Sequence, residues 1–222
     1  MKKILTTALA ISCAAMAYAK DIKGTVKDTE GNALSGVVVS DGLNTVLTDA
    51  KGKWKMEADD DSRFVFISTP SGYISSTLEG ETLFYKEIKE GVRKYEFVVE
   101  KNSKDDTKHN VIVIADPQIS ERSELADLSK QADDMAEFVK SMDGDYTFGI
   151  CLGDIVGWDH SIYPEYNSIM SKPGFEYRYV IGNHDMTNWG RSYETSMKNY
   201  EDMYGPAWYS FNVGDVHYIM LN

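Results

Sequence analysis

The stretch that decides the fold runs from Tyr179 to Asp185 and reads Y-V-I-G-N-H-D. A short apolar run of strand-forming residues ends here in a glycine, an amide, an imidazole and a carboxylate. A loop of this kind, directly after a strand, can place an oxygen ligand on a metal ion with a ring nitrogen beside it. We therefore expect this loop to form part of a functional site that the rest of the chain supports.

Two other apolar runs end in the same way. Residues 111–116 read V-I-V-I-A-D and are followed by Pro117 and Gln118, and residues 147–154 read T-F-G-I-C-L-G-D. In an open α/β sheet, ligands bind outside the carboxyl ends of the strands, where loops from neighbouring strands meet. The sequence therefore predicts one shared site with six side chains, which are Asp116, Gln118, Asp154, Asn183, His184 and Asp185.

Carboxylates, amides and imidazoles that converge from separate strands are ligands for a divalent metal ion. Asp116 and Asp154 are two such carboxylates, and Asn183 and Gln118 add amide oxygens. A carboxylate has two oxygens, so Asp154 can bridge two cations that lie ~3.5–4 Å apart. Each of these residues taken alone also suits a turn or a helix cap, and only the whole set points to a site.

Strand and helix patterns alternate after residue 110. The strand 111–115 is expected to be buried on both faces, as in a parallel sheet. Apolar residues recur at helical spacing from Ser123 to Met142, which predicts an amphipathic helix. The other expected elements are strands at 148–152, 177–181, 208–213 and 216–221, and helices at 161–170 and 193–204. This order is typical of βαβ units and predicts an α/β fold.

The segment from Asp21 to about Glu100 has a different pattern. Short strand-forming runs alternate with turn residues and show no long helical period, which predicts a small antiparallel β-sandwich. The sequence from Gly24 to Gly42, G-T-V-K-D-T-E-G-N-A-L-S-G-V-V-V-S-D-G, resembles the carboxypeptidase-regulatory and transthyretin-like modules at the front of exported bacterial proteins. The resemblance brings no catalytic residues and implies a spacer, a lid wall or a docking surface.

Residues 101–110 read K-N-S-K-D-D-T-K-H-N and are polar throughout, which predicts a linker in which His109 is solvated. The expected domain order follows from these patterns. It is a signal peptide at 1–19, a β-sandwich domain at 20–100, a linker at 101–110 and an α/β domain at 111–222.

The first nineteen residues have the pattern of a secretory signal. Lys2 and Lys3 precede an apolar run that ends at Met16, and a small-x-small cleavage site follows. The apolar run is shorter than the ~20 residues that a membrane span needs, so we expect no transmembrane segment in the mature chain. Removal of the signal leaves Cys151 as the only cysteine, which we expect to be a small buried hydrophobe. The protein is expected to be exported to a bacterial periplasm or cell envelope, or secreted.

The chain of 222 residues has a formal charge of −12. An acidic surface repels nucleic-acid backbones and anionic membranes unless a local basic patch overrides it. The charged stretches at 101–108 and 121–124 mix both signs, so the sequence contains no such patch. We therefore expect no nucleic-acid partner.

Three motifs carry a family resemblance. D-P-Q at Asp116–Gln118, G-D-I-V at Gly153–Val156 and G-N-H-D at Gly182–Asp185 resemble the first three motifs of the calcineurin-like metallophosphoesterases, D-x-H, G-D and G-N-H-[DE]. The resemblance covers residues 111–222 and implies the βαβ half of a four-layer α/β/β/α sandwich. It also implies two divalent metal ions, with a metal-bound hydroxide that hydrolyses phosphate mono- or diesters. The implied roles are Asp116 and Gln118 on the first ion, Asp154 bridging, Asn183 on the second ion, His184 as the acid at the leaving group and Asp185 as the residue that orients His184.

Two features depart from the family pattern. Gln118 stands where the family has a histidine, and its weaker amide oxygen favours Mn or Mg over Zn at that site, although the set Mn, Fe, Zn and Mg stays open. The chain stops at Asn222 without the family's later histidine motifs, and His217 is expected to be structural because it lies in an alternating apolar strand. We therefore expect a C-terminally truncated form that is itself inactive.

The sequence thus favours an exported metallophosphoesterase with a small phosphate-ester substrate. Trp158, Tyr163 and Trp189 follow the site strands and could line the substrate pocket, while His160 either approaches the site or begins the next helix. The alternative is a non-catalytic envelope protein whose sandwich recognises a partner or glycan. A nuclease is opposed by the acidic charge. Substrate identity and oligomeric state stay open.

Overall fold

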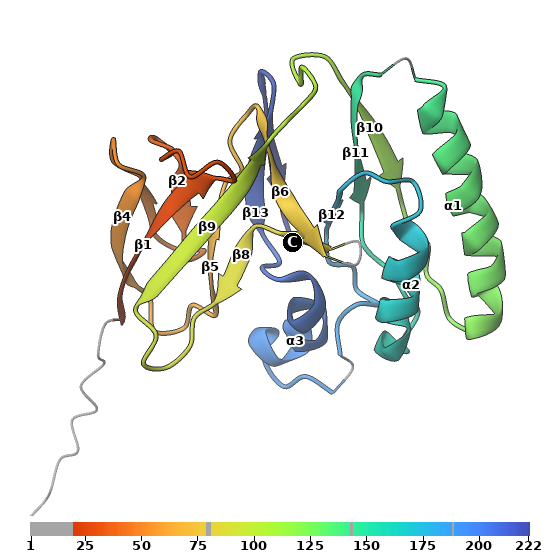
Figure 1. Cartoon of the computed structure of the whole chain (residues 1–222). Coiled ribbons are helices and arrows are strands. Elements are labelled where there is room, and N and C mark those ends of the chain that lie inside the picture. Colours follow the sequence, from red (N-terminus) through yellow and green to blue (C-terminus); the bar gives the residue numbers. More distant parts are fainter. Residues whose placement is uncertain (1–19, 79–80, 143, 188) are drawn as a thin grey trace, which may run out of the picture.

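A computed structural model describes residues 20–78, 81–142, 144–187 and 189–222. The predicted signal peptide lies outside the described residues. Figure 1 shows a strand-rich N-terminal part beside a C-terminal part that carries three helices.

The N-terminal part contains two sheets. The five-stranded sheet has the order β4-β1-β9-β6-β7, and the four-stranded sheet has the order β3-β2-β5-β8. β1 pairs with β9 in parallel and with β4 antiparallel, so the first sheet is mixed and the antiparallel prediction is wrong for this pair. The strand bounds are β1 (Lys20–Asp28), β2 (Val38–Ser40), β3 (Thr45–Leu47), β4 (Lys53–Ala58), β5 (Phe64–Ile67), β6 (Tyr73–Leu78), β7 (Glu81–Leu83), β8 (Tyr85–Glu87) and β9 (Lys94–Lys101).

Both sheets bury alternate side chains in one shared core. In β4, K-W-K-M-E-A, Trp54 and Met56 are buried while Lys53 and Lys55 are exposed. Val26 of β1 is fully buried in the same cluster as Val39 of β2 and Phe66 of β5. The alternation in the sequence therefore determines which face of each strand points inward.

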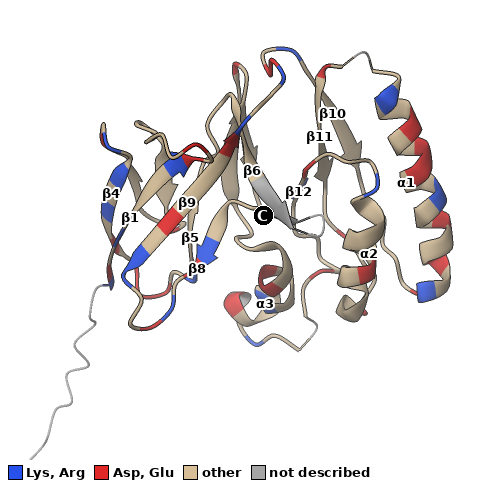
Figure 2. Ribbon diagram, in the orientation of Figure 1, with Lys and Arg blue, Asp and Glu red and all other residues tan. Residues whose placement is uncertain are grey.

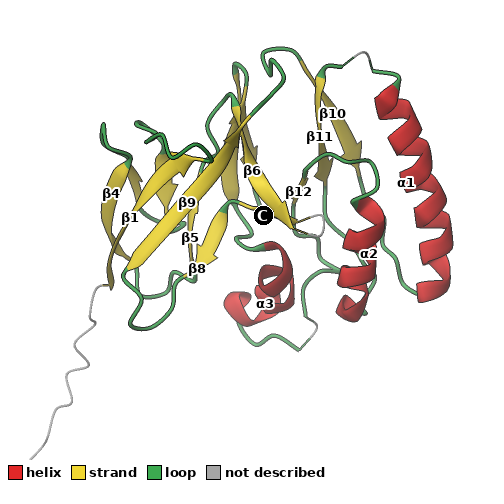
Figure 3. Cartoon of the chain, in the orientation of Figure 1, coloured by secondary structure: helices red, strands yellow, loops and turns green. Residues whose placement is uncertain are grey.

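The C-terminal part begins with three parallel strands in the order β10-β11-β12. The helical segments η1 (Arg122–Glu124) and α1 (Leu125–Lys140) connect β10 (His109–Ile114) to β11 (Tyr146–Cys151). In the same way, η2 (His160–Ile162) and α2 (Tyr163–Met170) connect β11 to β12 (Tyr177–Tyr179). Both α1 and α2 lie on the same side of these strands in Figure 3, and they bury Leu128 and Tyr166 in a second core. α3 (Tyr193–Tyr204) and the hairpin of β13 (Tyr209–Val213) and β14 (Val216–Met220) complete the fold, and each of these elements lies in a segment where the sequence predicted it.

β10 differs from the prediction of a strand buried on both faces. Its residues are mostly half-buried, and the side chain of Val113 is 56% exposed. The described helices cover the strand on one side only, so the apolar run reflects strand propensity more than burial.

The predicted linker is also different in the structure. β9 extends to Lys101 and β10 begins at His109, so only residues 102–108 connect them. Within this loop Asp106 is buried, and its carboxylate accepts a hydrogen bond from the Gly72 amide at 2.7 Å. The His109 ring lies 2.8 Å from the Asp106 carbonyl oxygen and 2.7 Å from the Tyr218 hydroxyl oxygen, so it is not a solvated linker histidine.

The N-terminal and C-terminal parts share one hydrophobic core. Phe148 of β11 and Phe211 of β13 belong to the same buried cluster as the sandwich residues Phe84 and Val99. Arg178 of β12 is 1% exposed and places its guanidinium over the rings of Phe84 and Phe211, at 4.9 and 4.5 Å. The two parts are therefore packed against one another and not merely joined end to end.

Figure 2 shows that α1 carries charged residues of both signs along its length. Lys130 pairs with Asp127 at 2.8 Å on this exposed surface. Among the described residues, no helix combines the length and the apolar character that a membrane span requires.

Candidate functional site

Three loops meet at the carboxyl ends of β10, β11 and β12. The Leu152 amide donates to the Ile114 carbonyl at 2.8 Å, and the Val180 amide donates to the Cys151 carbonyl at 2.8 Å. These ladder bonds continue beyond the strand ends and hold the three loops at one edge of the sheet. We name them the first loop (residues 115–118), the second loop (residues 152–157) and the third loop (residues 180–187).

The first and second loops are joined directly through backbone groups. The Gln118 amide donates to the Asp154 carbonyl at 2.7 Å, and Ile119 forms a parallel bridge with Val156. Asp116 and Asp154 are therefore presented by adjoining loops, as the strand-end argument predicted.

Three of the four predicted metal ligands have a left-handed backbone. The φ angles are 48° for Asp116, 45° for Gln118 and 49° for Asp154, and no other non-glycine residue in the described part of the chain has a positive φ. This conformation costs of order 1–3 kcal/mol per residue, and it persists where the surrounding structure imposes it. Such residues cluster at ligand-binding sites, so the backbone supports a site at these positions.

Two motif glycines allow the second and third loops to touch. A Cβ atom on Gly182 would lie 2.1 Å from Asp154 Oδ1 and 2.2 Å from the Asp154 amide nitrogen. Gly153 has a φ of 88°, and a Cβ there would lie 2.7 Å from the Gly182 nitrogen. The glycines in G-D and G-N-H-D are therefore required for close contact between the loops.

Asp154 holds the third loop in place. Asp154 is buried, and its Oδ1 accepts a hydrogen bond from the His184 amide at 3.0 Å. This bond fixes the backbone at His184 relative to the second loop.

Asp185 has partners other than the one predicted. Its carboxylate accepts hydrogen bonds from the amides of Ile155 at 3.1 Å and Gly182 at 2.9 Å, and from the Tyr163 hydroxyl at 3.0 Å. Within the described part of the chain, none of its hydrogen bonds reaches the His184 ring. Burial raises the pKa of the Asp185 carboxyl above its ordinary value, although these hydrogen bonds act in the opposite direction. Asp185 therefore ties the second and third loops together, and the predicted role of orienting His184 is not seen in its contacts.

The His184 ring has one buried and unpaired nitrogen. Nδ1 is buried without a hydrogen-bond partner, and the ring packs against Trp158 with 4.2 Å between the ring centroids. A proton on a buried nitrogen without an acceptor is unfavourable, so the neutral ring carries its proton on Nε2. Nε2 is thus the nitrogen that can donate a hydrogen bond to a ligand.

His160 is the residue that sequence reasoning did not place. It begins η2 and also reaches the site, because its Nε2 lies 3.0 Å from the carbonyl oxygen of His184. Its Nδ1 lies 2.8 Å from Asn199 Nδ2 of α3, and its ring stacks on Tyr163 at 5.4 Å. Because the Asn199 side-chain amide donates to Nδ1, this nitrogen is the acceptor and the neutral His160 ring carries its proton on Nε2. Nε2–H then donates to the His184 carbonyl.

The other predicted residues lie at different depths. Asp116 and Asn183 are exposed, and Gln118 is half-buried. His217 is exposed on β14 and bonds across the hairpin to Asn212 Oδ1 at 2.8 Å. Cys151 is free and buried, and burial raises the pKa of its thiol to about 12, so it is no nucleophile at neutral pH.

The three aromatic residues predicted to line a substrate pocket differ in exposure. Trp158 covers the His184 ring and is 51% exposed, so it lies at the site surface. Tyr163 is 1% exposed and bonded to Asp185, so it supports the loops and lines no pocket. Trp189 is 92% exposed.

The donor set determines which metal ion could be held. The described residues contain no group of three or more His, Cys, Asp or Glu side chains placed to bind an ion. Two carboxylates, Asp116 and Asp154, and two amides, Gln118 and Asn183, are oxygen donors that suit a hard cation such as Mg²⁺ or Mn²⁺.

Comparison with known proteins gives a family match for the N-terminal part of the chain. Residues 20–102 match a family model described as the N terminal of calcineurin-like phosphoesterase. The match supports the calcineurin-like phosphoesterase family. It spans the N-terminal part from the first residue of β1 to just beyond β9 and ends before the three loops. No curated protein matches the chain. The mixed α/β architecture, with several small sheets and few helices, is consistent with part of a calcineurin-like domain.

Proposed function

We propose that this protein is an exported, metal-dependent hydrolase of phosphate mono- or diesters. The observation that carries the proposal is the left-handed backbone of Asp116, Gln118 and Asp154 on two adjoining loops. The family match of the preceding sandwich supports the same reaction class. Export through the segment 1–19 and a periplasmic or envelope location belong to the proposal.

The proposed chemistry assigns each residue one task. Asp116, Gln118, Asp154 and Asn183 would hold a divalent cation, which when bound would draw charge from the phosphoryl oxygens. A water molecule would attack phosphorus as the ester P–O bond breaks, and its proton would pass to the departing oxygen. The Nε2–H group of His184 would hydrogen-bond to that oxygen and stabilise its developing charge. Trp158 would shield one face of the imidazole from water, because it packs on that ring.

The loop contacts position this hydrogen-bond donor. Asp154 binds the His184 amide and His160 binds the His184 carbonyl, so both sides of the residue's backbone are fixed. Asp185 fixes the same loop through the Gly182 amide. A hydrogen-bond donor held in this way needs little reorganisation when the ester bond breaks.

One observation favours the alternative of a non-catalytic binding protein. The described residues lack a cluster of three His, Cys, Asp or Glu side chains suited to a metal ion. In that case the loops would bind no ion, and the protein would act through another surface.

Hydrolysis of p-nitrophenyl phosphate and bis(p-nitrophenyl) phosphate with added Mn²⁺ tests the proposal. We expect activity in the natural full-length protein without residues 1–19, and we expect it to fall at least about a hundredfold in His184→Ala, the size typical of a lost hydrogen-bond donor at a developing charge. His217→Ala is the matched control, because His217 is exposed on the hairpin. Equal activity in both variants would contradict the role of His184, and no activity in the unmodified full-length protein would favour the alternative.

A further inference from the structure

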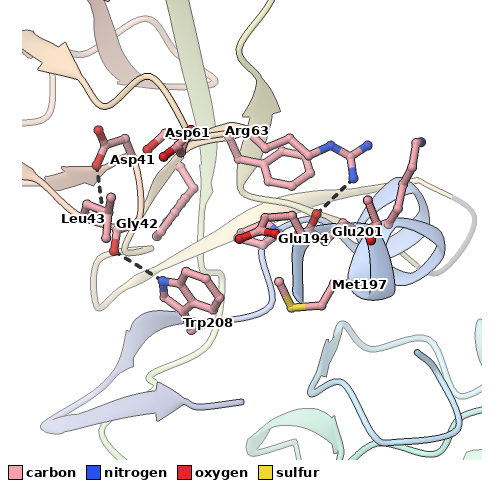
Figure 4. A pocket seen from close by; sticks show the side chains of 15 residues that line it. Asp41, Gly42, Leu43, Asp61, Arg63, Glu194, Met197, Glu201 and Trp208 are labelled. Carbon is pink, nitrogen blue, oxygen red and sulfur yellow. Dashed lines mark hydrogen bonds and ion pairs between the residues drawn. The ribbon is translucent and has the colours of Figure 1, made fainter. Parts of the chain in front are cut away.

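A cavity of about 470 Å³ lies between the N-terminal sheets and α3 (Figure 4). Its walls come from the turn after β2, the loop and first residues of β5, one face of α3 and the segment before β13. None of the six predicted site residues lines it. Cavities of this size hold small molecules, and they occur preferentially where two parts of a protein meet.

The base of the cavity is apolar and rigid. Phe64 and Phe66 are each 5% exposed and Met197 is 2% exposed, so these side chains are fixed by packing. Trp208 forms a more open wall, with 37% of the residue exposed. Its indole N–H donates to the Gly42 carbonyl at 3.3 Å, which holds the ring in one orientation.

The cavity already contains a cation on an aromatic ring. The Arg63 guanidinium lies 4.9 Å from the centre of the Phe64 ring. It also pairs with Glu201 at 3.0 Å and with Asp202. Aromatic rings and carboxylates around a positive charge are the arrangement that binds organic cations.

Two carboxylates at the rim of the cavity form no ion pair among the described residues, unlike Glu201 and Asp202. Arg63 is neutralised by Glu201 and Asp202, and Lys198 pairs with Asp202 at 2.6 Å. Asp61 and Glu194 are exposed and form no ion pair among the described residues. The mouth of the cavity therefore carries uncompensated negative charge beside the exposed Trp208 ring. This charge repels anionic ligands and attracts cations.

We propose that this cavity binds a small organic cation with an apolar body, of the quaternary ammonium class. The apolar part would lie against Phe66 and Met197, and the positive centre would lie on the Trp208 face near Asp61 and Glu194. Because the site shares no residue with the three loops, this inference is independent of the proposed hydrolysis.

The test compares choline with dimethylbutanol, in which carbon replaces the charged nitrogen. Both are titrated into the chain from Lys20 onward, and binding is followed by NMR at the Trp208 indole N–H and the Met197 methyl group. We expect choline to bind at least about fivefold more tightly than the neutral isostere. Equal affinities, or no shift at either group with choline, would overturn the proposal.

Variants separate the two parts of the site. Asp61→Asn with Glu194→Gln should reduce choline affinity by about two- to tenfold and leave dimethylbutanol binding unchanged, because only the charge is lost. Trp208→Leu should weaken choline more than dimethylbutanol, because it keeps an apolar wall but removes the π face. Trp189→Ala is the control, since Trp189 lies outside the cavity. Choline binding that the Asp61/Glu194 double variant leaves unchanged would contradict the assignment.

Discussion

At the scale of single residues, backbone conformation marks the candidate site more clearly than side-chain proximity. The positive φ angles of Asp116, Gln118 and Asp154 cost free energy, and within the described part of the chain no other non-glycine residue has one. The sequence indicated these positions as metal ligands, but it gave no indication of their conformation. The residue types in a sequence indicate which ligands a site could bind. The backbone conformation of those residues depends on contacts with neighbouring loops, which a local sequence pattern does not contain.

Gln118 allows a direct test of this strain. At an ordinary position alanine stabilises a protein relative to glycine, but at a left-handed position the order reverses. We predict that Gln118→Gly unfolds with a free energy about 1 kcal/mol higher than Gln118→Ala, measured by urea denaturation. Because both variants lose the amide, the comparison isolates the backbone. An alanine variant that is the more stable of the two would show that Gln118 is not strained.

Asp185 predicts a specific dependence of stability on pH. Burial raises the pKa of its carboxyl in the folded chain above the ordinary value of 3.8. As the pH rises from about 4, the Asp185 carboxyl loses its proton in the unfolded chain before it does so in the folded chain. The contribution of Asp185 to the free energy of unfolding therefore falls until the pH exceeds the pKa of this carboxyl in the folded chain. The difference in unfolding free energy between the unmodified chain and Asp185→Asn should therefore decrease over this window. A difference that stays constant or increases would contradict the raised pKa.

At the scale of elements, the sequence patterns predicted where most strands and helices lie. They did not predict the contacts between these elements. The apolar periodicity of 123–142 predicted the region of α1, and the run ending in G-N-H-D predicted β12 and the third loop. His160, Tyr163 and Asn199 were not recognised as a connected group, because they come from η2, α2 and α3, and α3 meets the other two only in the folded chain. Short-range patterns cannot report such contacts.

His160 should act as a positioning residue for the third loop. His160→Phe keeps an aromatic ring on Tyr163 but removes the donor to the His184 carbonyl. We predict a loss of about tenfold in kcat with little change in KM, corresponding to one hydrogen bond of about 1.4 kcal/mol. His160→Gln, which keeps a donor group, should recover part of the activity.

A structural role alone would give a different result. In that case His160→Phe and His160→Gln would lower activity only in proportion to their loss of thermal stability. Chemical shifts of ¹⁵N-labelled histidine give a second measurement, and the neutral His160 ring should carry its proton on Nε2.

At the scale of the whole molecule, the N-terminal part and the strand before the third loop share buried contacts. Arg178 bonds to Thr69 Oγ1 at 3.2 Å and Glu176 Oε1 at 3.4 Å, between the rings of Phe84 and Phe211. The sequence did not indicate this, because an arginine between two tyrosines in a short strand is usually exposed. The predicted linker suggested two parts connected only by the chain, whereas the core crosses between them.

Removal of one partner from this buried pair should be costly. Arg178→Met leaves the Glu176 carboxylate without its cation, and we predict a loss of about 3–5 kcal/mol in unfolding free energy. The double variant Arg178→Met with Glu176→Gln should recover much of the loss, because no buried charge remains. A double variant as unstable as the single one would show that the packing of Arg178 against the two rings matters more than its charge.

The central claim is that the three strand-end loops form one cation site. Mn²⁺ titration followed by EPR, on the chain from Lys20 onward, tests it most directly. We predict binding of one Mn²⁺ that is lost in Asp154→Ala and kept in His217→Ala. Binding that Asp154→Ala leaves unchanged, or no binding to the unmodified chain, would contradict the claim.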